Sequence, residues 1–386
     1  MTELKTPVAA PLAAAVAVAL PQNIFNTAKS DYAGTVDQSL FLGEDPGLFD
    51  TVHRNFPKIW ELYKTMKSLD WDELEFDFSS CNLEFKTASK AVAQCMIRTL
   101  AWQWEADSVA ANTLLVVMAP FISAPELQAA YGRITDNEVL HASTYSEIVR
   151  SSFDDPNTVL NEVLQVKEAM QRLRTVAEVL SKAKRISSEL SLGLRSKDDP
   201  EVYDAILMAE VAFLVLERIQ FMASFAVTFA IGETGLFMPI AKAVQKICQD
   251  EYEIHVQTHK EVLLHELRLP RGKEAFGRLR PLIKKLIDEV TLSELTWTEY
   301  ALDGNPLVGL TAAKLKEWVL FSAKDVYEFF AIGAEFTFPK ANPLPYMERW
   351  MDMSKTQASP QEQQNGQYKV NVIQRTDEGK VFQVDW

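Results

Sequence analysis

Cysteine is scarce in this sequence. Its three cysteines, Cys81, Cys95 and Cys248, lie far apart and form no CxxC pair. An odd number of widely spaced cysteines excludes a disulfide-stapled scaffold and gives no sign of a thiol redox pair. We therefore expect reduced thiols in a cytoplasmic protein.

Basic residues are in the minority. The chain holds 39 Lys and Arg against 53 Asp and Glu, which gives a formal net charge of −14. Contacts with nucleic-acid phosphates need an excess of Lys and Arg. The composition therefore excludes a protein that binds nucleic acid through a basic surface.

Uninterrupted apolar runs are also lacking. Residues 205–232 are long enough to span a bilayer, but Glu210, Glu217 and Arg218 fall inside them. Each would cost about 2.5–3.5 kcal/mol at the bilayer centre, so no membrane span is expected. The shorter run at 13–20 has little basic flank. We expect residues 1–30 to be a disordered arm rather than a signal peptide.

Helix-period apolar patterns fill most of the chain, whereas strand alternation is nearly absent. In "SAPELQ", Ser123, Pro125 and Glu126 predict a capping box that opens a helix. An all-α domain over residues 31–350 is expected. Its predicted helices cover about 87–119, 123–152, 154–193, 199–232 and 239–267, with two more before "FPKANPLPY".

After residue 350 the sequence becomes polar and rich in Gln, and we expect a flexible tail over 351–386. This tail carries Tyr368 and ends in "VFQVDW". Aromatic residues at the end of a tail are typical of a docking peptide.

Carboxylates stand among apolar neighbours in four of the predicted helices. Burying an unpaired carboxylate is costly, and metal coordination is one usual escape. Four carboxylates and two imidazoles from four helices are the set that a helical bundle uses for a dinuclear iron or manganese site. The candidate ligands are Asp107, Glu138, His141, Glu217, Glu251 and His255.

Each element alone has an ordinary alternative. A single ExxH is common on solvated helix faces, and Glu217 could pair with Arg218 instead of a metal. Glu105 competes with Asp107. The order and spacing of all four elements together favour the metal site.

The chain resembles the β subunit of class I ribonucleotide reductase from about Asn55 to the C-terminus. In "TDNEVLHASTYSEI" (135–148), Glu138 and His141 match the family's Glu-x-x-His, and Tyr145 matches its radical tyrosine. Asp107 in "ADS" and Glu217 match its other helices. "WDELEFD" (71–77) and "NPLPYMERW" (342–350) resemble two further family segments.

The resemblance implies a ferritin-like bundle, a homodimer and a partner, the catalytic α subunit, which the tail would dock. The six candidate ligands would hold two metals, an iron pair in the first place or Mn–Mn or Mn–Fe pairs. O₂ would oxidise Tyr145 to a radical inside a wall of Phe221, Phe225 and Ile247. The oxidising equivalent would then pass through Asp250, Trp71 and Tyr368 to reduce ribonucleotides in the α subunit.

The second His motif departs from the family, because four residues rather than three separate the candidate ligands in Glu251-Tyr252-Glu253-Ile254-His255. A π-bulge would absorb the extra residue and keep Glu251 as a ligand. Counting back from His255 instead puts Tyr252 at the ligand position, with Glu253 and His259 as substitutes. Two other functions share such a bundle: a diiron oxidase or oxygenase, and a non-catalytic metal-binding protein.

Overall fold

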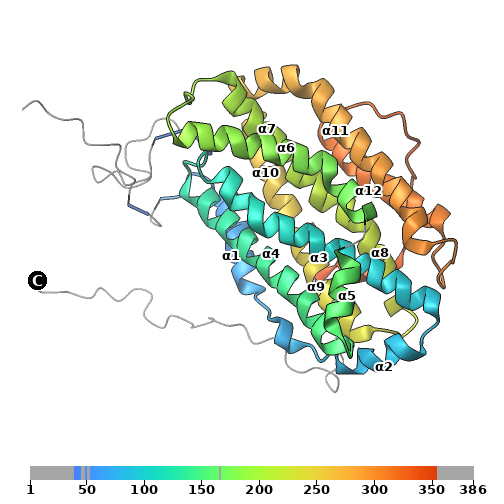
Figure 1. Ribbon diagram of the computed structural model, residues 1–386. Coiled ribbons are helices and arrows are strands. Elements are labelled where there is room, and N and C mark those ends of the chain that lie inside the picture. The colour runs from blue at the N-terminus through green and yellow to red at the C-terminus, as the bar shows by residue number, and fades with distance from the viewer. Residues whose placement is uncertain (1–38, 45–47, 50–52, 165–166, 354–386) are drawn as a thin grey trace, which may run out of the picture.

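The computed structural model describes residues 39–44, 48–49, 53–164 and 167–353, and these are largely helical (Figure 1). The predicted N-terminal arm, Tyr368 and nearly all of the predicted tail lie outside these ranges. In chain order the elements are α1 (Pro57–Ser68), the 3-10 helix η1 (Glu73–Glu75), α2 (Ser79–Thr87), α3 (Lys90–Met118), α4 (Pro125–Ser152), α5 (Pro156–Val163), α6 (Lys167–Ser191), α7 (Pro200–Val215), the π-helix η2 (Leu216–Gln220), α8 (Phe221–Gly232), α9 (Met238–Gln249), the π-helix η3 (Asp250–His255), α10 (Val256–Glu266), α11 (Pro270–Leu302), α12 (Ala312–Phe329) and α13 (Tyr346–Met351).

Isolated β-bridges join Phe41 with Ile122 and Leu307 with Leu310, and the described ranges contain no β-strand. The all-α prediction is confirmed. The long helices run side by side, with α3 against α4 and α6 against α7 (Figure 1). No helix among the described residues is long and apolar enough to cross a membrane.

The central segment of the bundle is α7, η2 and α8. Every residue from 209 to 232 is buried, including Glu210, Glu217 and Arg218. The segment packs against α3, α6, α10 and α11. The apolar stretch that could be mistaken for a membrane span is therefore the core of the bundle.

The predicted capping box at the start of α4 is wrong. Ala124 is the N-cap and makes no side-chain cap hydrogen bond. Ser123 instead accepts a hydrogen bond from the Gly43 backbone N–H and donates one to the Ser39 carbonyl. Glu126 accepts from the backbone N–H groups of Asn55 and Phe56. Both side chains join α4 to the preceding chain, because partners distant in sequence outcompete the local cap.

The single helix predicted over 154–193 is two helices, α5 and α6. The α5 residues Val159 and Val163 form a small separate core with Ala101 of α3 and Val149 of α4. Helix α6 packs instead against α3, α7 and α11. Both helices carry the same apolar period, so the pattern does not reveal that the chain changes neighbours between them.

Candidate metal centre

Four elements of the bundle bring the six predicted ligands together. Asp107 lies on α3, Glu138 and His141 on α4, Glu217 on η2, and Glu251 and His255 on η3. All are buried. They form two groups whose ligand atoms lie within 4.8 Å of one another: Asp107, Glu138, His141 and Glu251, and Glu138, Glu217, Glu251 and His255. The two groups share Glu138 and Glu251, which is the geometry of two metals bridged by carboxylates.

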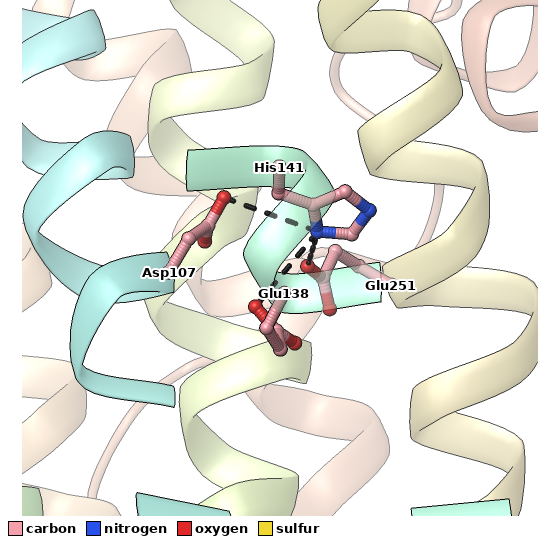
Figure 2. A group of neighbouring side chains, drawn as sticks. All are labelled: Asp107, Glu138, His141 and Glu251. Atoms are coloured by element: carbon pink, nitrogen blue, oxygen red, sulfur yellow. Dashed lines mark ion pairs between the residues drawn. The ribbon is translucent and has the colours of Figure 1, made fainter. Parts of the chain in front are cut away.

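The two imidazoles face the carboxylates with the same ring nitrogen. His141 Nδ1 lies 3.0 Å from Glu251 Oε1, 3.8 Å from Glu138 Oε2 and 3.9 Å from Asp107 Oδ2 (Figure 2). His255 Nδ1 lies 2.8 Å from Glu251 Oε2 and 3.2 Å from Glu138 Oε1. The Nε2 atom of each ring faces away, toward Asp250 for His141 and toward Asn137 for His255.

The π-helix η3 explains how the longer second motif still converges on the site. Hydrogen bonds in a π-helix run from residue i to i+5, so a turn holds more than four residues. Glu251 and His255, four apart, therefore lie on one face and contact each other. The expected π-bulge is confirmed, and Glu251 rather than Tyr252 lies at the centre. Glu217 also lies in a π-helix, η2, which packs directly against η3.

The competing groups lie elsewhere. Arg218 pairs with Asp325, not with Glu217, and its guanidinium lies over the ring of Tyr252. Tyr252 and Glu253 line a cavity of about 390 Å³ beside α12 and α13. Neither Glu105 nor His259 belongs to either ligand group.

His259 is part of a second buried polar cluster that the sequence did not reveal. Its Nδ1 lies 3.0 Å from Glu210 Oε2, and the Tyr131 hydroxyl donates to the same carboxylate at 2.7 Å. Tyr131 and Glu210 lie seven residues before the candidate ligands Glu138 and Glu217, respectively. That spacing, two helical turns along the same stripe, was the available signal.

The chemistry of the donors fits a pair of metal ions. None of the four oxygens of Asp107 and Glu138 receives a well-aligned hydrogen bond from the described residues. Burial and the negative charges nearby raise the pKa of Asp107 and of Glu217 well above the usual range. Two cations would supply the charge that these carboxylates lack. Carboxylate and imidazole ligands suit iron or manganese.

The two imidazoles are held near acidic groups. Burial alone lowers the pKa of His255, but the charge of Glu251, the hydrogen bond with Glu251 and the nearby Glu138 carboxylate raise it to about 9. Burial likewise opposes protonation of His141, yet its hydrogen bond to Asp250 and the nearby Glu138 and Glu251 carboxylates raise its pKa well above the usual range.

Tyr145 lies beside the carboxylates on α4, one turn after His141, and is fully buried. Burial is the main cause that raises its pKa well above the usual range, and the charges of Asp107, Glu251 and Glu138 raise it further. Phe221, Phe225 and Ile247, expected from the resemblance as an apolar wall, are all completely buried, and the two phenylalanines stack at 5.6 Å. The phenol therefore keeps its proton and is protected from water.

A hydrogen-bonded chain leads outward from His141. Its Nε2 lies 3.2 Å from Asp250 Oδ2, and the indole Nε1 of Trp71 donates to the same oxygen at 2.8 Å. The rings of His141 and Trp71 are nearly parallel, with centroids 6.1 Å apart. Along this hydrogen-bonded series, the exposed fraction of the residue rises from 0% at His141 to 5% at Asp250 and 9% at Trp71. The third residue expected on this path, Tyr368, lies outside the described residues.

The chain is similar in sequence to known ribonucleotide reductase small chains. Residues 49–343 match the family model described as "Ribonucleotide reductase, small chain". The ribonucleoside-diphosphate reductase subunit beta of Buchnera aphidicola subsp. Schizaphis graminum is 22% identical over an alignment of 351 residues, which covers 87% of this chain and 93% of the relative.

Solved structures share the fold at low identity. The ribonucleotide reductase R2 subunit from Clostridium botulinum superposes with a TM-score of 0.73 at 15% identity, over 86% of this chain and 99% of that one. The dimanganese(II)-NrdF of Streptococcus sanguinis gives 0.60 at 13% identity, over 79% and 99%. The ferritin-like bundle is thereby confirmed. Because the family model spans well over half of the chain, which also presents two overlapping ligand groups beside a buried tyrosine, the protein belongs to the ribonucleotide reductase small chain family.

Proposed function

We propose that the chain is the β subunit of a ribonucleoside-diphosphate reductase, which generates a tyrosyl radical at Tyr145 and passes the oxidising equivalent to a catalytic α subunit. The observation that carries the proposal is the pair of ligand groups that share Glu138 and Glu251 beside this phenol. When bound, a dimetal pair in such a site supplies, with O₂, the one-electron oxidant. The α subunit would then reduce ribonucleotides to deoxyribonucleotides.

The protein's own residues would divide the work as follows. The carboxylates and the Nδ1 atoms would hold the metals, and Tyr145 would lose one electron and its hydroxyl proton. Among the carboxylates, the charge of Asp107 raises the pKa of that phenol most, so Asp107 is the group we propose to take the proton. Asp250 would hold the indole of Trp71 against His141 for transfer outward.

An iron pair is the metal content we propose. Oxygen and nitrogen ligands of this kind also accept manganese, and the related protein from Streptococcus sanguinis is a dimanganese(II) form. Loading the metal-free protein separately with Fe(II) and with Mn(II), followed by O₂, would decide between them. A radical formed with manganese but not with iron would contradict the iron assignment.

Electron paramagnetic resonance tests the central claim. The protein, loaded anaerobically with Fe(II) and then exposed to O₂, should give a tyrosyl signal that Tyr145→Phe abolishes. Iron uptake should remain unchanged, because the phenol is not among the ligands. Tyr131→Phe is the matched control, since Tyr131 is equally buried on the same helix but bonds to Glu210. Oxidised iron without any tyrosyl signal would contradict the proposal.

The tail, from residue 351, would dock the α subunit, and the chain would act as a homodimer. Truncation after Gln367 should leave radical formation intact and abolish nucleotide reduction with the α subunit. Tyr368→Phe separates docking from relay, because it should keep binding to the α subunit and lose turnover. A truncated protein with full reductase activity would exclude this role for the tail, and a monomer by light scattering would exclude the dimer.

A further inference from the structure

The outward-facing nitrogens of the two candidate ligand histidines have different partners. His141 Nε2 faces a carboxylate, Asp250, at 3.2 Å. His255 Nε2 faces a neutral amide, with Asn137 Nδ2 at 3.5 Å. Asn137 directly precedes Glu138 on α4 and is 3% exposed.

The tautomer of His255 decides which atom of Asn137 it needs. A histidine that binds a metal through Nδ1 carries its proton on Nε2, which must then find an acceptor. Asn137 Oδ1 has no hydrogen-bond partner among the described residues. A half-turn of the amide exchanges Nδ2 and Oδ1 and leaves the rest of the side chain in place. The rotated amide would satisfy both Oδ1 and the Nε2 proton.

We propose that Asn137 is a positioning residue, which accepts the Nε2 proton of His255 and thereby keeps its Nδ1 directed at the second metal position. The inference rests on the proposed function, because it takes His255 as a ligand. It assigns a role to a buried amide that the ligand motif does not contain.

The different Nε2 partners of His141 and His255 predict different metal affinities at the two positions. A carboxylate partner makes an imidazole a stronger donor, and a neutral amide does so less. Each ligand group otherwise offers three carboxylates and one histidine. The position next to His255 should therefore bind its metal more weakly than the position next to His141.

Anaerobic titration of the metal-free, full-length protein with Mn(II), with free Mn(II) followed by electron paramagnetic resonance, tests this. The parent should bind two ions per chain with unequal affinities. Asn137→Leu, similar in size but without an acceptor, should weaken the second ion by about 10- to 100-fold and leave the first unchanged. Asn137→Asp keeps the acceptor and should bind the second ion at least as tightly as the parent.

Thr144→Val is the matched control. Thr144 lies on the same helix, is equally buried and donates only within α4, to the Leu140 carbonyl. It should bind both ions as the parent does. The inference would be overturned if Asn137→Leu bound the second ion as tightly as the parent does, or if it lost both ions together. Either result would leave the proposed function standing.

Asn137→Asp keeps the test decisive if Asn137→Leu does not fold. Weaker binding of the second ion by Asn137→Asp would also overturn the role of the acceptor. A parent protein that binds fewer than two ions would instead remove the dimetal site itself, and the proposed function with it.

Discussion

At Asp250 a single oxygen, Oδ2, contacts both the Nε2 of His141 and the indole N–H of Trp71. The carboxylate lies at the first residue of η3 and is 5% exposed. A buried carboxylate with two nitrogen partners is held in one orientation, because turning it away would leave a charge unsatisfied. The position of Trp71 relative to His141 therefore depends on Asp250.

Trp71→Phe tests that dependence. The variant should form the Tyr145 radical normally, since no candidate ligand changes, but nucleotide reduction with the α subunit should fall to background. Loss of the hydrogen bond to the carboxylate should cost about 1–3 kcal/mol of stability. The measurements are the radical yield and the turnover rate with the α subunit.

Trp318→Phe is the control for this variant. Trp318 is also buried and donates its indole N–H to a carbonyl, that of Met222, away from the path. It should lose stability and keep turnover. Full turnover in Trp71→Phe would exclude the proposed path.

The residues of the site were largely predictable because acidic and imidazole side chains among apolar neighbours are chemically conspicuous. Asn137 could not be predicted, because an Asn directly before a Glu belongs to no sequence motif that would mark it as part of the site. Its meaning depends on Nε2 of His255, which lies 118 positions later.

At the scale of the element, two π-helices, η2 and η3, pack against each other, and each carries candidate ligands. A π-helix holds an extra residue inside an otherwise regular helix, and the flanking turns keep their own alignment. In η3 the extra residue separates Glu251 from His255 by four positions.

Removing the extra residue should be tolerated. Deleting Glu253 gives Glu251 and His255 a three-residue spacing, which an ordinary helical turn also places on one face. We expect a melting temperature within about 4 °C of the parent, because roughly 1 kcal/mol corresponds to about 2–4 °C in a domain of 150–250 residues and to less in a larger protein. Thermal unfolding followed by circular dichroism is the measurement.

Deletion of Gln257 is the matched control, because this residue is also partly exposed but lies in the regular helix α10. The deletion should turn Val262 and Leu263 out of the core and lower the melting temperature by roughly 10 °C or more. Similar losses in both variants would show that η3 does not hold a removable residue.

Element boundaries show what the sequence could not supply. The apolar period predicted that most helices exist, and it placed α3 within three residues of its ends. The side-chain partners of Ser123 and Glu126 lie about 70 to 84 positions away, so local cap chemistry gave a wrong answer there. The division of 154–193 into α5 and α6 goes with the different helices that the two contact.

At the scale of the whole molecule, Asp325 of α12 joins two other elements. Its Oδ2 accepts from Arg218 Nε of η2 at 2.9 Å and from Lys260 Nζ of α10 at 2.6 Å. Burial would raise the pKa of Asp325, but the charge of Arg218 and the hydrogen bond from Lys260 lower it below the usual value. The contact therefore stabilises the fold above the pKa of the unfolded carboxyl and is lost as pH falls through the folded value.

Asp325→Asn should reveal this pH dependence. At pH 7 the free energy of unfolding of the variant should be about 1–2 kcal/mol lower than that of the parent. This value is at the lower end for hydrogen bonds to charged groups, because the Asp325 side chain is 38% exposed. The difference in free energy of unfolding between parent and variant should decrease as the pH approaches 3. Urea unfolding of metal-free protein at several pH values measures it.

Asp303→Asn serves as the control, since the pair with Arg98 leaves Asp303 64% exposed and should contribute less. A stability difference for Asp325→Asn that stays constant from pH 7 to pH 3 would contradict the electrostatic origin.

Exposure rises only from 0% at His141 to 9% at Trp71, so the outer end of the proposed route is still largely covered by protein. If the proposed route is right, a reductant in solution would reach the Tyr145 radical through the small exposed part of the Trp71 indole, as the α subunit would. The lifetime of the radical would then depend on how well Trp71 is covered as well as on the burial of Tyr145. The Trp71→Phe protein lacks the indole of this route, so it should keep its radical longer than the parent when both are mixed with dithionite.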